Sequence, residues 1–416
     1  MDENYVQFTK EMKGTHKILV PNMLPMHFKI MSRIFRQYGY DLEVLETTGP
    51  EIAETGLKYV HNDTCYPAIL VIGQFINALQ SGKYDVSKTA LMLFQTGGGC
   101  RASNYISLLR KALKTAGYGY VPVLSLNLLG MEKHPGFKLK LSMLVKFVYA
   151  VLYGDLLMLL SNQCKPYEKI EGQTEKTADF WTNKLTDEMN EGKGLTNKQA
   201  RNNYKLIIDD FLKIERNRVK KVKVGIVGEI FVKYSPLGNN NLADFLISQN
   251  AEIVTPGLLD FCMYCVKNSI VDNKLYKLNK KGVAFSKIAF SFLKKRQEEL
   301  INAVNASKVF CPPTRFEHTI SLVEDYIGLG TKMGEGWLLP AEMFELVDSG
   351  VKNIICTQPF GCLPNHICGK GMMKPIKERN KNVNIVAIDY DAGASRVNQE
   401  NRIKLMLSNA GDSLSS

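Results

Sequence analysis

Residues 89–116 read TALMLFQTGGGCRASNYISLLRKALKTA, and this segment sets the architecture that we expect for the whole chain. Residues 89–95 are an apolar run typical of a buried strand. Three glycines and Cys100 follow, and the residues from there to Ala116 are expected to form a helix. A strand that enters a helix through a glycine-rich turn is the repeating unit of a parallel α/β sheet.

The same alternation continues on both sides of this segment. Apolar runs predict strands at 17–20, 42–45 and 121–124, and helices are expected at 28–38 and 68–79. Strands that alternate with crossover helices favour a parallel, doubly wound sheet. We therefore predict a first α/β domain over residues 1–132, which carries Cys65 and Cys100.

Residues 133–219 contain almost no strand signal and are expected to form a helical domain, with long periodic or charged stretches at 137–160, 174–191 and 196–217. The most apolar part of it, 141–161, contains Lys146 and Asp155. We interpret this part as a buried helix and not as a membrane span.

A second α/β domain is expected over residues 220–416, and it carries Cys362. Its predicted strands are 221–227, 252–254, 353–356 and 383–388, and a long amphipathic helix is expected to end near Ala306. Further helices are predicted at 340–348 and 394–407. The fold class is therefore α/β, with two parallel-sheet domains and a helical domain between them.

Composition limits the possible functions. The 416 residues carry a net charge of +12, but no known nucleic-acid-binding motif accompanies it, so we do not expect nucleic acid as a partner. The polar N-terminus does not have the pattern of a secretory signal. Nine cysteines in such a chain indicate a reducing compartment, where metal or redox chemistry is more common than disulfides. We expect a cytoplasmic protein with no membrane partner.

Three cysteines, Cys65, Cys100 and Cys362, lie in turns where packing does not explain a thiol. Thiols at strand-to-helix turns are good ligands for a soft metal centre such as an iron–sulfur cluster. The glycines before Cys100, in particular Gly98 and Gly99, would let the backbone approach the cofactor closely. A phosphate-binding loop is the competing interpretation, but the Gly-Lys-Ser/Thr ending of such loops is absent.

Other residues are weaker candidates. Cys356 and Cys368 each lie six residues from Cys362, so either is a possible additional metal ligand. The pair Cys262 and Cys265 has C-x-x-C spacing without a second pair, which favours a structural role on a helix. Two further thiols and one acid complete the set: Cys164 and Cys311 are expected to be incidental, and Glu335 is either an acid–base group or part of a loop.

Five segments carry a resemblance to a known family. They are NDTCYPAILVIGQFINAL (62–79), QTGGGCRASNYISLLRKAL (95–113), GEIFVKYSPLGNNNL (228–242), GEGWLLPAEM (334–343) and QPFGCLPNHICGKGM (358–372). Together they resemble the 2-hydroxyacyl-CoA dehydratase superfamily, and more closely its acyl-CoA dehydratase activase-related branch. The resemblance covers nearly the whole chain.

The resemblance implies Rossmann-like or flavodoxin-like domains that hold an iron–sulfur cluster. In the dehydratases each [4Fe–4S] cluster has three cysteine ligands and one open iron, which by position implies Cys65, Cys100 and Cys362 here. It also implies an ATP-hydrolysing activase as partner, and this chain has no recognisable ATPase segment, so the activase is expected on a separate chain. The implied chemistry is reductive or radical dehydration of an acyl-CoA, by a dehydratase-like lyase or a reductase component.

Two alternatives remain open. A related branch holds a double-cubane [8Fe–9S] cluster and reduces small molecules, which here would require three ligands beyond the first three. The second alternative is a non-catalytic cluster-bearing subunit or electron relay in a larger complex, paired with a second cluster subunit or with a copy of itself.

Overall fold

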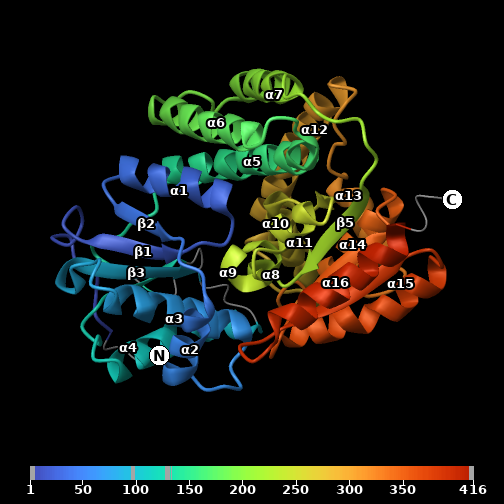
Figure 1. Cartoon of the computed structure of the whole chain (residues 1–416). Helices are drawn as coiled ribbons and strands as arrows, with labels where there is room; N and C mark the ends of the chain where they lie inside the picture. Colours follow the sequence, from blue (N-terminus) through green and yellow to red (C-terminus); the bar gives the residue numbers. More distant parts are fainter. Residues whose placement is uncertain (1–4, 95–98, 127–131, 133, 412–416) are drawn as a thin grey trace.

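The first parallel sheet lies at the N-terminal side of the computed structural model, which describes residues 5–94, 99–126, 132 and 134–411 (Figure 1). Its strands run in the order β2-β1-β3-β4 and all pair in parallel. Their bounds are β1 Lys17–Pro21, β2 Asp41–Leu45, β3 Thr89–Phe94 and β4 Val123–Leu126. This is the order of a flavodoxin-like doubly wound sheet, which places a ligand at the carboxyl ends of the central strands.

The crossover helices of this sheet begin where proline or the loop sequence allows. They are α1 Pro25–Gln37, α2 Pro50–Tyr59, α3 Tyr66–Gln80 and α4 Tyr105–Thr115. Proline is in the first turn of α1, α2 and α3, where its missing N–H costs nothing. Helix α2 was not predicted, and β4 begins two residues later than the predicted strand.

Three long helices follow the first sheet, as predicted. They are α5 Leu141–Cys164, α6 Gln173–Asn190 and α7 Asn197–Leu212, and they lie together at the top of Figure 1. The stretch Leu141–Tyr167 is long and apolar enough to cross a membrane, but 61% of its most apolar window is buried within the protein. It therefore packs as a core helix.

The second sheet repeats the topology of the first. Its four parallel strands have the order β6-β5-β7-β8. Their bounds are β5 Val222–Gly228, β6 Ala251–Val254, β7 Asn353–Pro359 and β8 Asn384–Tyr390. The predicted fold class, with two parallel-sheet regions, is thus confirmed.

Helices surround the second sheet. They are α8 Ile230–Tyr234, α9 Pro236–Asn239, α10 Leu242–Ser248, α11 Leu258–Tyr276, α12 Val283–Ala306, α13 Phe316–Val323, α14 Leu338–Asp348, α15 Met373–Arg379 and α16 Arg396–Gly411. The long helix expected to end near Ala306 is confirmed as α12, and the hairpin that it forms with α11 was not predicted. Lys277 and Asn279 adopt positive φ angles of 57° and 51°, which end α11 and reverse the chain.

The hydrophobic core is not divided at the predicted domain boundaries, because each cluster of buried residues contains residues from more than one predicted domain. One cluster of buried residues joins α1, the three helices α5 to α7, and the face of the second sheet covered by α11, α12 and α14. A second cluster joins α3 and α4 to the face of the second sheet covered by α10 and α16. The helical region therefore shares its core with both sheets.

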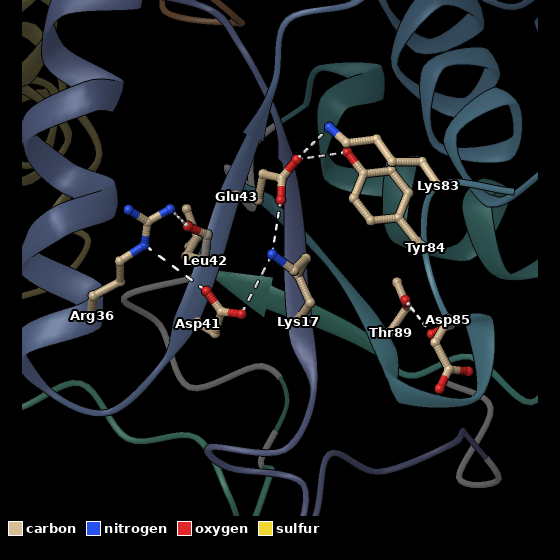
Figure 2. Close-up of polar contacts among 9 residues, drawn as sticks. All are labelled: Lys17, Arg36, Asp41, Leu42, Glu43, Lys83, Tyr84, Asp85 and Thr89. Atoms are coloured by element: carbon tan, nitrogen blue, oxygen red, sulfur yellow. Dashed lines mark hydrogen bonds and ion pairs between the residues drawn. The ribbon is translucent and has the colours of Figure 1, made fainter. Parts of the chain in front are cut away.

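The amino edge of the first sheet is closed by an ion-pair network (Figure 2). Glu43 accepts hydrogen bonds from Lys17 at 2.9 Å, from Lys83 at 2.8 Å and from the Tyr84 hydroxyl at 2.8 Å. Burial would raise the pKa of Glu43, but these donors outweigh it and lower the pKa to about 2. This edge is thus occupied by structural contacts, in contrast to the carboxyl edge.

Candidate metal centre

The three predicted cysteines come from three loops that meet between the two sheets. Cys100 lies in the loop after β3, Cys362 follows β7, and Cys65 is the N-cap of α3. The carboxyl ends of parallel strands are where such sheets bind ligands. The backbone N–H of Tyr66 donates a 3.0 Å hydrogen bond to the carbonyl of Phe360, which ties the first sheet's loop to the second's.

Close backbone packing at this junction requires glycine. Gly361 has a φ of +72°, and a Cβ there would lie 3.0 Å from the Cα of Cys65. A Cβ on Gly334 would lie 3.9 Å from the Cys100 sulfur, and one on Gly99 would overlap the Met333 sulfur. Gly99 thus packs against Met333, the predicted approach of its backbone to a cofactor stays a prediction, and Gly98 lies outside the described residues.

Each thiol lies near backbone N–H groups at the start of a helical turn. Burial raises the pKa of Cys100 to about 11, and the N–H of Ala102 opposes this increase. Burial likewise raises the pKa of Cys65 and of Cys362, opposed by N–H groups of the residues three positions later, Ala68 and Asn365. A backbone N–H therefore acts on each sulfur in favour of the thiolate, but burial outweighs it, so the pKa of each thiol stays above its ordinary value.

The three thiols also influence one another. A charged Cys65 contributes to the raised pKa of Cys100, and a charged Cys100 contributes to that of Cys362. The Cys65 sulfur and the buried Tyr105 hydroxyl are hydrogen-bonded at 3.0 Å. The structure thus brings Cys65, Cys100 and Cys362 into one electrostatic group, drawn from both sheets.

Two buried carboxyl groups accompany the thiols. Glu229 follows β5 and accepts a 2.9 Å hydrogen bond from the N–H of Val232, and Glu335 accepts one of 2.9 Å from the N–H of Ile230. Burial, followed by the charge of Glu335, raises the pKa of Glu229 to about 8. Burial also raises the pKa of Glu335. At neutral pH Glu229 therefore retains its proton beside the cysteines.

The two weaker ligand candidates occupy different surroundings. Cys356 is fully buried within β7, and its thiol donates a 3.4 Å hydrogen bond to the Asn365 side chain. Burial raises its pKa to about 12, and none of the three cleft thiols contributes to that increase. Cys368 lies in the turn Asn365–Gly369, where burial and then the charge of Glu335 raise its pKa. Cys356 shares Asn365 with Cys362, and Cys368 shares Glu335 with Cys100 and Cys362.

The remaining thiols lie elsewhere in the fold. Cys262 and Cys265 are on a helix, α11, as predicted, but Cys265 is exposed and does not lie on the packed face that a structural role would give it. Cys164 is buried at the end of α5, and Cys311 is exposed in the loop after α12. None of these four is among the groups that shift the pKa of Cys65, Cys100 or Cys362.

Sequence reasoning missed two polar neighbours of the thiols. Glu229 directly follows a buried strand, and this position at a strand's carboxyl end was a usable signal. Tyr105 lies five residues after Cys100 within the glycine-rich segment, but nothing in a single sequence reveals that its hydroxyl reaches Cys65. Glu335 was considered as an acid–base group, and the structure places it beside the thiols.

Among the described residues, no three His, Cys, Asp or Glu side chains are grouped closely enough to hold one metal ion. A cubane cluster differs from a single ion because each thiolate binds a different iron. If the chain holds such a cluster, Cys65, Cys100 and Cys362 would be its ligands, and the irons would supply the positive charge that these thiolates need. Comparison of the chain with known family models and with curated proteins finds no match.

Proposed function

We propose that the chain is a cytoplasmic iron–sulfur protein of the 2-hydroxyacyl-CoA dehydratase type. It would receive low-potential electrons from an ATP-hydrolysing activase on another chain and use them in reductive or radical dehydration chemistry. The single observation that carries the proposal is the convergence of Cys65, Cys100 and Cys362 from two sheets. Two of these thiols follow strands β3 and β7 and the third begins α3, and thiols gathered in this way favour a cofactor over three independent packing roles.

The cluster would be a [4Fe–4S] centre held by these three cysteines, and when bound it supplies a single low-potential electron. The protein's own contribution is the set of buried groups around the thiols. Cys65 and Cys362 are only 4% and 7% exposed, so water has little access to their sulfurs. The N–H groups near the sulfurs and the Tyr105 hydroxyl would stabilise the negative charge that rises on reduction.

The carboxyl pair gives the cleft a proton source. Expulsion of a hydroxyl group as water consumes one proton, and a group that stays protonated at neutral pH is suited to donate it. Glu229 meets this condition with its pKa of about 8. Glu335 helps Glu229 to keep this proton, because the charge of Glu335 raises the pKa of Glu229.

Anaerobic reconstitution followed by iron and acid-labile sulfide analysis tests the proposal. We expect about four irons per chain in the wild type. Cys100→Ala should lose most of this iron, whereas Cys311→Ser, which changes an exposed thiol outside the cleft, should keep it. A colourless wild-type protein without iron would overturn the cluster assignment, and about eight irons would indicate the double-cubane alternative.

A second candidate function, a cluster-bearing subunit of a larger complex, is favoured by the surface of the α11–α12 hairpin. Residues 273–297 contain seven lysines and one arginine but no acidic residue. Phe285 and Ile288 on this hairpin are 75% and 69% exposed, and Leu275, Tyr276, Leu278 and Phe292 are exposed beside them. An apolar surface surrounded by lysines fits a partner chain with an acidic contact face.

The subunit alternative has its own test. If the chain acts alone with its activase, purified wild type and activase should turn over an acyl-CoA or a small reducible substrate. Phe285→Ser should then leave the rate unchanged. If the chain is a relay inside a complex, the two proteins should give no turnover even when the iron content is complete.

A further inference from the structure

A cavity lies at the amino ends of the strands in the second sheet. The loop that carries Cys362 lies at the opposite, carboxyl ends of these strands. The cavity measures about 520 Å³ and is bounded by the end of α5, the segment after α7, the start of β5 and β6, and the loop after α12. Its lining includes Tyr167, Arg216, Arg218, Lys223, Glu252 and Phe310. A volume of this size falls in the range of sites for small organic ligands.

The walls of this cavity are held in place by hydrogen bonds. The Gln163 side chain donates to the Cys311 carbonyl at 2.9 Å and accepts from the Cys311 N–H at 2.8 Å. The Tyr167 hydroxyl donates to Glu252 at 2.6 Å, and the Asn217 N–H donates to the Tyr167 carbonyl at 2.8 Å. The cavity is therefore preformed and needs little ordering before it binds.

Its lining has a net positive charge. Arg216, Arg218 and Lys223, from the basic run RNRVKKVK (216–223), line it together with the carboxylate of Glu252. Lys223 pairs with Glu252 at 3.4 Å, but within the described part of the chain Arg216 and Arg218 have no carboxylate partner. The amino ends of the strands in the first sheet differ, because there Lys17 pairs with Asp41 and Glu43, and Lys83 pairs with Glu43 (Figure 2).

Arg216 is also held in position. Its guanidinium carbon lies 4.8 Å from the centre of the Phe310 ring, and its Nη1 donates weakly to the Cys164 sulfur at 3.8 Å. A guanidinium that is stacked on a ring and lacks a carboxylate keeps most of its donors for an anion. Phosphate is the anion whose geometry the arginine fork matches best.

The cavity continues inward. A smaller chamber of about 120 Å³ shares Gln163, Lys223, Glu252 and Cys311 with it. Its walls are mostly apolar, with Met158, Leu159, Ile253, Leu300 and Pro312, but Asp155, Asp260 and Glu345 also line it. The basic mouth and the mostly apolar, acid-lined chamber together suit a molecule with a phosphate at the mouth and an uncharged organic part inside. Inorganic phosphate alone would leave the chamber unused.

We propose that this cleft binds a nucleotide-sized organic phosphate, with its phosphate on Arg216 and Arg218 and its carbon part over Phe310 toward the chamber. The site is separate from the cysteines, because β5 alone spans seven residues, or about 23 Å, between the two edges of the sheet. The ligand would therefore be an effector and not a reactant at the thiols. The proposal does not depend on a bound cluster.

Titration calorimetry on the chain, with ADP, fructose 1,6-bisphosphate and inorganic pyrophosphate as probes, tests this site. We expect at least one of the two organic phosphates to bind one per chain and more tightly than pyrophosphate. Arg216→Gln and Arg218→Gln should each weaken binding about tenfold. Arg201→Gln, which changes an exposed arginine on α7, is the matched control and should bind like the wild type.

Each other outcome would overturn the proposal. Arg218 is exposed, so its variant should fold normally. Unchanged affinity in that variant would show that the ligand does not bind in this cavity. Absence of binding at millimolar ADP and fructose 1,6-bisphosphate would exclude an organic phosphate site. Tighter binding of a single-stranded oligonucleotide, with affinity that grows with its length, would identify a nucleic-acid surface instead.

Discussion

The backbone N–H of Tyr66 donates a 3.0 Å hydrogen bond to the carbonyl oxygen of Phe360. Tyr66 directly follows Cys65 in the sequence, and Phe360 lies two residues before Cys362. Through this bond the N-terminus of α3, in the first sheet's layer, is fixed to the loop after β7 in the second. The geometry of the thiol group therefore depends on how the two sheets are joined.

Gly361→Ala tests this junction. A Cβ at Gly361 would enter the backbone of Cys65 at 3.0 Å, and the φ of +72° is unfavourable for alanine. We expect a loss of about 2–4 kcal/mol in the free energy of unfolding and a marked loss of iron after reconstitution. Chemical denaturation and iron analysis measure the two effects.

Gly350→Ala is the matched control, because Gly350 has a similar φ of +85° but nothing within 4 Å of the added Cβ. It should cost only about 1–2 kcal/mol and leave the iron content unchanged. Equal iron in both variants would show that the junction does not shape the thiol group.

The layered fold was predictable because its strands are buried on both faces. The run at β3 is continuous and apolar, so its strand and the helix after Cys100 followed directly from the sequence. The α11–α12 hairpin was not, because a lysine and an asparagine, and no proline, reverse the chain there. Local propensity does not reveal a left-handed lysine.

The candidate site was predictable only in part. The turns after β3 and β7 identify Cys100 and Cys362, since parallel strands end at one edge. The proximity of Glu229 and Glu335 depends on the packing of α8 against the loop before α14, through the hydrogen bond from Ile230. Such contacts between segments about 100 residues apart have no signature in a single sequence.

Cys356→Ala tests the number of cysteine ligands. The thiol of Cys356 is fully buried in β7 and donates to Asn365, so its removal should cost about 1–2 kcal/mol of stability. The iron content should not change. Cys362→Ala is the matched comparison at the end of the same strand, and it should lose most of the iron; a loss of half the iron in Cys356→Ala would instead favour a larger cluster.

Glu229→Gln should change the pH dependence of stability. The folded protein keeps the Glu229 proton up to about pH 8, whereas the unfolded chain releases it near the ordinary pKa of 4.5. The folded state therefore binds more protons between these values, and the free energy of unfolding falls as pH rises from about 4.5 to 8. Glutamine removes this penalty, so the variant should gain about 2–4 kcal/mol relative to wild type at pH 8.5 and almost nothing at pH 4.5.

Urea unfolding at both pH values measures this difference. Glu54→Gln, an exposed change on α2, is the control and should follow the wild type at each pH. A variant at Glu229 that parallels the wild type across the range would mean that the buried carboxyl pair does not hold a proton at neutral pH.

Glu43→Gln should show the opposite sign. The donors Lys17, Lys83 and Tyr84 hold the folded pKa of Glu43 near 2, below the ordinary value of 4.5. The contribution of the carboxylate to stability is therefore fully present above pH 4.5 and is lost as pH falls toward 2. Because the side chain is 23% exposed, solvent reduces the effect, and we expect the variant to lose about 1–2 kcal/mol at pH 7.

That loss should shrink as the pH is lowered and should vanish near pH 2, where the wild type is protonated as well. Acid titrations followed by circular dichroism, with Glu46→Gln as the exposed control just after β2, measure it. High salt should also reduce the difference at pH 7, because dissolved ions screen the attraction between Glu43 and the two lysines. A constant difference from pH 7 to pH 3 would mean that Glu43 contributes by packing and not by its charge.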